Sequence, residues 1–199
     1  MMKDSAAAAI QEIDEACSAV HAMGEDRLDA GALFRAHGHF VASFLVKLGV
    51  DPSELEDAVQ DVFVVAHQRG GFVAGAARPT TWLAEIACRV ASTRRRTRRR
   101  RPEAVGDQEL ALAASPQSLP SDVAEASQGL RRVQQALMTL ELGYRAVFIL
   151  YELEGESCET IAAGLGIPVG TVYSRLHKAR KQFSEAHARL VAAPARSAR

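Results

Sequence analysis

Residues 156–181 read ESCETIAAGLGIPVGTVYSRLHKARK and predict two short helices joined by a tight turn. Ser157 is a good N-cap for the first helix, because its hydroxyl can accept a hydrogen bond from a free backbone N–H of the first turn. Gly164 and Gly166 are expected to end that helix, since glycine tolerates the left-handed backbone of a helix terminus. Pro168 suits the first position of the second helix, where a missing N–H costs nothing.

The second helix has two chemically different faces. Apolar residues recur at helical spacing and form a buried stripe, which comprises Val172, Leu176, Ala179 and Phe183. The opposite face is polar and mostly cationic, and it comprises Tyr173, Ser174, Arg175, His177, Lys178, Arg180 and Lys181. Such a pair is typical of a helix-turn-helix that reads the major groove of DNA. An ordinary helical hairpin with a solvated basic face is the alternative that spacing alone leaves open.

Charge is clustered along the chain. The 199 residues suggest one or two small domains, and an apolar content of 48% is sufficient for a hydrophobic core. The formal net charge is zero, yet residues 89–101 hold eight arginines and no acid, and residues 102–128 hold five acids and no base. Residues 167–199 hold seven bases and one acid. Such local patches, rather than the total, govern affinity for DNA.

Several functional classes are disfavoured by what the sequence lacks. Cys17, Cys88 and Cys158 are far apart, which argues against a disulfide framework or a zinc site. No apolar run approaches membrane-spanning length, and the N-terminus has no signal-peptide pattern. No nucleophile–base pair, phosphate-binding loop or metal-ligand cluster stands out. We therefore expect a cytoplasmic protein that is not an enzyme and has no cofactor or metal.

The first part of the chain predicts further helices. Apolar residues recur every three or four positions over residues 29–48, which indicates an amphipathic helix. Residues 51–56 read as a second helix start, with either Asp51 or Ser53 as its N-cap. The helix over residues 55–68 then buries one face. Its exposed polar face comprises Asp57, Gln60 and Asp61, a pattern for which simple solvation is the default explanation.

Glycine and proline over residues 70–79 predict a loop. Thr80 or Thr81 is expected to cap the next helix, over residues 82–100. That helix ends in the arginine run of residues 94–101, which repels itself unless a polyanion is close.

Composition changes again after the arginine run. Residues 102–127 are rich in Pro, Ser, Ala and acids and predict a flexible linker. Two apolar helices follow, one built on Leu130, Val133, Leu137 and Leu140 and the other over residues 144–153. The prediction is an all-α protein with two small helical domains joined by a flexible acidic linker, the second a helix-turn-helix domain. The expected N-terminal extension covers residues 1–28, the first domain 29–101 and the linker 102–127. The second domain is expected over residues 128–190 and a disordered tail over 191–199.

Two groups of motifs resemble one known family. Residues 166–180, GIPVGTVYSRLHKAR, follow YELEG at 151–155 and resemble region 4 of an extracytoplasmic-function (ECF) sigma factor, a promoter-specificity subunit of bacterial RNA polymerase. Residues 56–63, EDAVQDVF, and residues 81–91, TWLAEIACRVA, resemble region 2 of that family. The resemblance covers roughly residues 30–101 and 128–185. It implies a sigma factor that directs RNA polymerase to specific promoters and starts transcription by recruitment, not catalysis.

The resemblance also implies roles for individual residues. The face that docks on the largest polymerase subunit comprises Asp57, Gln60 and Asp61. The residues directed at the minus-ten element are Phe72, Trp82, Arg89, Thr93, Arg94, Arg95 and Arg96. The residues directed at the minus-thirty-five element are Thr171, Tyr173, Ser174, Arg175, His177, Lys178 and Lys181. The implied partners are core polymerase through its largest and second-largest subunits, promoter DNA and an anti-sigma factor, with no membrane insertion.

The chain departs from the family pattern near the expected base pocket. Many relatives have Arg-Asn where this chain has Cys88-Arg89, and an acid where it has Thr93. Trp82 by itself is also explained as a core aromatic. Two other functional classes stay open, namely a free-standing helix-turn-helix repressor that dimerises on a palindrome, and a polymerase-binding adaptor that keeps the Asp57 face without reading promoters.

Overall fold

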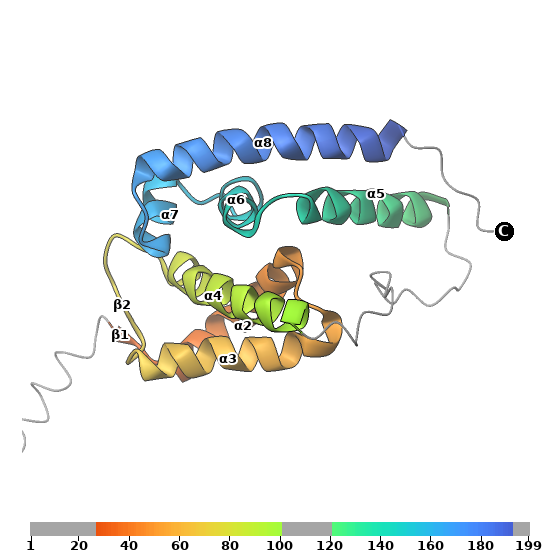
Figure 1. Cartoon of the computed structure of the whole chain (residues 1–199). Coiled ribbons are helices and arrows are strands. Elements are labelled where there is room, and N and C mark those ends of the chain that lie inside the picture. Colours follow the sequence, from red (N-terminus) through yellow and green to blue (C-terminus); the bar gives the residue numbers. More distant parts are fainter. Residues whose placement is uncertain (1–26, 101–120, 193–199) are drawn as a thin grey trace, which may run out of the picture.

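The computed structural model describes residues 27–100 and 121–192. The first half comprises α2 (Ala30–Leu48), a 3-10 turn (Pro52–Glu54), α3 (Leu55–Gln68) and α4 (Pro79–Arg100). The second half comprises α5 (Ser121–Met138), α6 (Leu142–Phe148), a π-helical segment (Ile149–Leu153), α7 (Cys158–Leu165) and α8 (Val169–Ala192). In Figure 1, α4 lies between the α2–α3 pair and the second half, and α8 runs along the outer side. The predicted all-helical, two-part architecture is confirmed for these residues.

Parts of the predicted organisation lie outside the described residues. They are the N-terminal extension over 1–26, the linker over 101–120 and the tail over 193–199.

The capping residues in the first half follow the expected chemistry. The Asp29 carboxylate accepts the Ala32 N–H at 2.6 Å and starts α2, and Gly49 ends that helix with a φ of 90°. Asp51, and not Ser53, caps the next start, because its carboxylate accepts both the N–H of Ser53 at 3.0 Å and its hydroxyl at 2.7 Å. These hydrogen bonds lower the pKa of Asp51.

A short β-ribbon corrects two predictions. β1 (Arg27–Leu28), expected in the N-terminal extension, pairs antiparallel with β2 (Phe72–Val73), expected in a loop. Strands of two residues are too short to leave an alternating pattern in the sequence. Gly71 makes the crossing possible, since a Cβ there would lie 2.3 Å from the carbonyl oxygen of Leu28 and its φ is 86°.

The start of α4 also differs from the prediction. The helix begins at Pro79, so neither Thr80 nor Thr81 is its N-cap. Thr81 lies in the first turn, where its hydroxyl accepts the N–H of Arg78 at 3.1 Å and donates to the same residue's carbonyl at 3.0 Å. Proline is well suited to this first position, because the N–H it lacks would have no partner inside the helix.

Two boundaries in the second half are corrected in the same way. Helix α5 already begins at Ser121, inside the segment expected as linker, and α8 continues through Ala192, beyond the expected end at 190. Leu130 is 58% exposed and does not belong to the buried stripe. Leu140 is buried but lies after the end of α5.

The predicted helix-turn-helix is present, with one change. The Ser157 hydroxyl accepts the N–H of Thr160 at 3.1 Å and caps α7, as expected. Gly166 ends α7 with a φ of 63°. Pro168 is predicted as the first residue of the next helix, but α8 begins at Val169, so Pro168 lies immediately before it. Gly164, expected to stop the helix, instead lies inside α7 against the first half, where a Cβ would fall 2.3 Å from that of Thr81.

The two halves share one buried core and meet at a polar joint. Arg145 of α6 is only 4% exposed and donates to the carbonyl of Leu48 at 2.5 Å, across the boundary between the halves. Its second terminal nitrogen donates to the carbonyls of Met138 at 2.9 Å and Leu140 at 2.8 Å. Burial, and to a lesser degree the charge of Arg95, lowers the pKa of Arg145 to about 10, so the guanidinium stays protonated at neutral pH.

Glu156 provides the second polar part of the joint. Its carboxylate is buried, accepts the Thr80 hydroxyl at 2.8 Å and lies 3.3 Å from the Arg78 guanidinium. A half-exposed ion pair between Lys47 and Glu154, at 2.7 Å, lies at the edge. The halves are therefore connected by direct packing as well as by residues 101–120.

Replacing Gly164 by alanine tests the closeness of this joint. The added methyl group would overlap Thr81, so Gly164→Ala should lower the free energy of unfolding by about 1–3 kcal/mol or separate the halves. Gly129→Ala is the matched control, because nothing lies within 4 Å of a Cβ at that helical position. Alanine there should stabilise by up to about 1 kcal/mol. Urea unfolding and small-angle scattering measure both effects, and equal stability and size for the two variants would contradict the assigned contact.

Candidate nucleic-acid and polymerase interface

Helix α8 presents most of its predicted DNA-reading residues to solvent. Tyr173 is 54% exposed, and its hydroxyl donates to the Glu159 carboxylate at 3.1 Å. This hydrogen bond raises the pKa of Tyr173. The pKa of Glu159 is lowered, first by a backbone N–H of its own residue at the start of α7 and then by Tyr173. The phenol is thus held neutral and oriented by α7.

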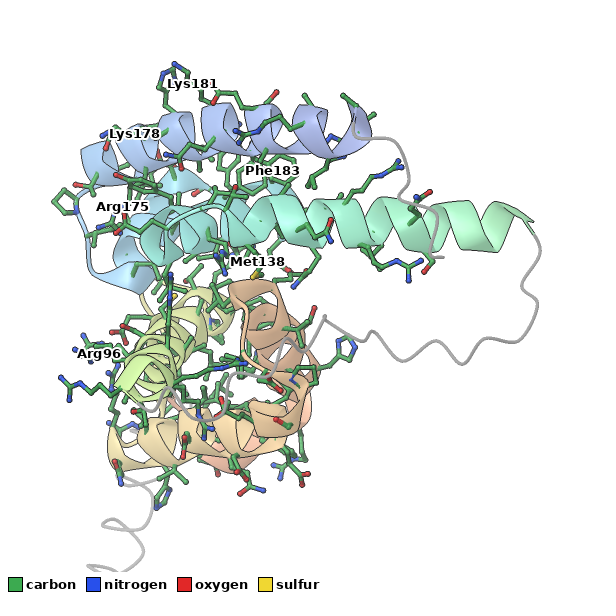
Figure 2. All side chains as sticks on the ribbon, turned by 45° about the vertical axis from the view of Figure 1, so that its right-hand side comes forward. Arg96, Met138, Arg175, Lys178, Lys181 and Phe183 are labelled. Atoms are coloured by element: carbon green, nitrogen blue, oxygen red, sulfur yellow. The ribbon has the colours of Figure 1, made fainter. Side chains whose placement is uncertain are left out.

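The neighbouring polar residues of α8 fill the same face. The Ser174 hydroxyl donates to the Thr171 carbonyl at 3.0 Å, and the Lys178 amine lies 6.0 Å from the centroid of the Tyr144 ring. His177 and Lys181 are exposed, and Figure 2 shows Lys181 pointing away from the first half. This face can therefore enter a DNA groove without disturbing the core beneath it.

Two arginines of α8 do not belong to that outer face. Arg180 pairs with Glu152 at 2.6 Å and lies 5.0 Å from the centroid of the Tyr151 ring, which makes it a supporting residue. Arg175 is half-buried, and a Cβ on Gly143 would lie 3.3 Å from its guanidinium. It lines a cavity toward α4 as well as a smaller one beside Ser174 and Lys178, so it lies at the inner edge of the predicted DNA-reading face.

The predicted minus-ten residues divide into buried and exposed groups. Trp82 is half-buried, and its ring meets that of Phe72 edge-on with centroids 5.8 Å apart. Phe72 is only 5% exposed, so it supports Trp82 and offers no free ring face here. Thr93, Arg95 and Arg96 are exposed on α4.

The other two arginines predicted to be directed at the minus-ten element form ion pairs. Arg94 pairs with Asp61 of α3 at 2.6 Å, and Arg89 pairs with Glu85 one turn earlier. Glu85 also accepts from Arg69 at 2.7 Å. Because each pair keeps one partly exposed partner, its contribution is modest, about 1 kcal/mol or less, and it can yield to phosphate.

The predicted polymerase-docking face is exposed on α3. Asp57, Gln60 and Asp61 all lie on the solvent side, and Val64 beside them is 53% exposed. Phe63 is 8% exposed and meets Phe34 edge-on at 5.1 Å, so it belongs to the core and not to this face. The face thus combines two carboxylates and an amide with a small apolar centre.

Sequence reasoning missed the residues of the joint. Arg145, Gly164 and Glu156 act through partners more than 70 positions away, so no local spacing marks them. One available signal was the arginine itself, since a charge within the apolar segment 144–153 must have buried partners. Within residues 27–100 and 121–192, no cluster of three His, Cys, Asp or Glu side chains could hold a metal, and no helix is long and apolar enough to cross a membrane.

Known protein families match both halves. Residues 33–101 match the family model described as Sigma-70 region 2, and residues 130–183 match Sigma-70, region 4. The ECF RNA polymerase sigma factor SigL of Mycobacterium tuberculosis is 34% identical over 74% of this chain and 82% of its own length. The RNA polymerase sigma factor CnrH of Cupriavidus metallidurans is 32% identical over 87% of this chain and 94% of its own length.

Solved structures agree with this match. The structure of CnrH in complex with the cytosolic domain of CnrY superposes with a TM-score of 0.55 at 26% identity, covering 78% of this chain and 85% of that one. The sigma factor RpoE in complex with the anti-sigma factor NepR from Bartonella quintana gives 0.58 at 23% identity, covering 77% and 92%. The chain is therefore a member of the ECF sigma factors, and it directs RNA polymerase to promoters.

Proposed function

We propose that the two halves recognise different promoter elements. The first half binds core polymerase through Asp57, Gln60 and Asp61 and holds the minus-ten strand along α4. The second half reads the minus-thirty-five element with the outer face of α8. The observation that carries this proposal is the pairing, in one chain, of an exposed acidic and amide face on α3 with an exposed polar and cationic face on α8. The chain acts by binding in the cytoplasm and catalyses no reaction.

Both elements cannot be bound while the joint is closed. The two elements are about 25 base pairs apart, which is about 85 Å along B-DNA. A compact body of about 150 residues has a radius of gyration of about 15 Å and spans about 40 Å. Residues 101–120 can reach up to about 70 Å when extended, so separating the halves would allow both contacts. We therefore infer that promoter binding opens the joint around Arg145.

An anti-sigma factor is the proposed antagonist. Two solved relatives, RpoE with NepR and CnrH with CnrY, are sigma factors held in such complexes. A protein that bound both halves of this chain would stabilise the closed arrangement and keep α4 and α8 from spanning a promoter, because binding to one state shifts the population toward it.

Charge reversal at Asp61 tests the docking face. Asp61→Lys should weaken binding to core polymerase at least tenfold, because a carboxylate that meets a basic partner is replaced by a repelling amine. Stability should fall by no more than about 1–2 kcal/mol, since only the exposed pair with Arg94 is lost and a like charge is added. Glu185→Lys on α8 is the matched control. Titration with fluorescently labelled core measures both, and wild-type affinity for Asp61→Lys would remove it from the docking face.

Replacing Trp82 tests strand opening. Trp82→Ala should leave closed-complex formation nearly unchanged and reduce melting of the minus-ten region, because a stacking surface worth about 1–3 kcal/mol per base is lost. Permanganate reactivity of thymines measures melting. Pre-melted templates should restore transcription by the variant. Failure of that rescue, or an unfolded variant by circular dichroism, would mean that Trp82 acts only as a core residue.

Lys178 and Arg131 provide a test of base reading. Lys178→Ala should cost about 1–3 kcal/mol on the preferred minus-thirty-five element and less on a mismatched one, because a base-directed donor is lost. Arg131→Ala, which removes an exposed charge on α5, should change neither. Footprinting at two salt concentrations measures both variants. Equal losses on the two sequences, with a shallower salt dependence, would assign Lys178 to the phosphate backbone instead.

A further inference from the structure

A groove lies between the halves where α4 faces the second half. Its main cavity has a volume of about 520 Å³ and is lined on the α4 side by Cys88, Arg89, Ser92, Thr93 and Arg96, and on the α8 side by Arg175. A smaller cavity of about 260 Å³ shares Arg175 with it and is also lined by Ser174 and Lys178. The size of the main cavity suits small molecules, which often bind at domain boundaries.

Positive charge converges on this groove from two helices. Figure 2 shows Lys178 and Arg175 on α8 and Arg96 on α4 along the same side of the molecule. Within the described part of the chain, none of these three has a carboxylate at ion-pair distance. Arg89 shares the carboxylate of Glu85 with Arg69.

Only two acidic groups border the two cavities, Glu85 in the larger and Glu141 in the smaller. Glu85 is already engaged by Arg69 and Arg89. The Cys88 thiol does not add a negative charge, because burial, and then the charge of Glu85, raises its pKa to about 12. The groove therefore carries a surplus of cations, beside the hydroxyls of Ser92 and Thr93.

We propose that this groove binds a compact polyphosphate, either inorganic or as part of a phosphorylated small molecule such as a nucleoside triphosphate. Arginine forks and hydroxyl groups are suited to phosphate oxygens, and charge-assisted hydrogen bonds are the stronger ones. A nucleic-acid strand has the same phosphate chemistry but is extended, whereas the arginines of the larger cavity come from both halves and converge on one hollow, which favours a compact ligand.

The site exists only in the closed arrangement, since Arg96 belongs to the first half and Arg175 to the second. A ligand that bridges them stabilises the closed state by mass action. If, as we propose above, promoter binding separates the halves, the ligand opposes it. A polyphosphate would then act as an inhibitor that senses the supply of phosphorylated metabolites. This consequence rests on the proposed function, whereas binding itself does not.

The experiment uses the full chain without polymerase or promoter. Calorimetry measures binding of sodium tripolyphosphate and of ATP, with sodium chloride at matched ionic strength as the reference. Alkylation of Cys88 by iodoacetamide, followed by mass spectrometry of its peptide, reports closure, because the buried thiol becomes accessible to the reagent only when the halves separate. Both probes should bind, and saturating ligand should slow Cys88 alkylation at least fivefold. Tighter binding of ATP than of tripolyphosphate would identify a nucleoside-linked ligand, and equal binding the polyphosphate alone.

Three variants make the result specific to the groove. Arg96→Gln and Arg175→Gln should each weaken tripolyphosphate binding about tenfold or more, because each removes charge-assisted hydrogen bonds. Arg131→Gln removes an exposed charge elsewhere and should bind like the wild type. Equal affinities for all three variants, no binding beyond the chloride reference, or protection of Cys88 by a single-stranded oligonucleotide but not by tripolyphosphate would each overturn the proposal. None of these outcomes bears on promoter direction, which is measured with polymerase.

Discussion

The buried guanidinium of Arg145 is the constraint on which the closed arrangement depends. It joins the end of α2 in the first half to the turn between α5 and α6 in the second. Removing such a charge from water costs several kcal/mol, and the cost is offset only while carbonyl oxygens from both halves surround it. If the halves separate, the same group is solvated again. The joint is thus stable when closed and tolerable when open, which suits the opening on promoter binding that we propose.

Helix α4 has the most varied surroundings in the molecule. One side packs on α2 and α3, another contacts α7 through Thr81 and Gly164, and the exposed strip between them carries Thr93 and Arg96. A helix presents only about three such faces. The residues proposed to contact DNA and the residues that form the joint must therefore alternate along α4. Arg175 and the α4 arginines line one cavity because the helix proposed to read one promoter element is packed near the helix proposed to hold the other.

The sequence predicts features that depend on neighbouring residues. Ser157 and Gly166 delimit α7 as expected, and the face of Asp57, Gln60 and Asp61 is exposed as expected, because capping and amphipathic spacing are local properties. Gly164 was misread for the same reason. A glycine near a helix end suggests termination, whereas its actual requirement comes from Thr81, 83 positions earlier.

The β-ribbon and the joint could not be predicted from local spacing. The ribbon pairs Leu28 with Phe72 in strands of two residues, and Arg145 reaches Leu48 across 97 positions. Contacts of this kind leave no periodic trace in the sequence. The family resemblance supplied the roles of the two halves, but it says nothing of how this chain packs one half against the other.

The covalent connection between the halves, residues 101–120, affects how much of the protein is in the closed state. A flexible linker of the length of residues 101–120 would keep the two surfaces at an effective concentration on the order of millimolar. If the contact between the halves had an intrinsic dissociation constant of about 1 mM, or about 4 kcal/mol, half of the molecules would then be in the closed arrangement. Lengthening or shortening this tether would shift the balance between open and closed without changing any residue proposed above to contact DNA or polymerase. The length of the segment between the halves would therefore set the threshold at which a sigma factor of this kind becomes active.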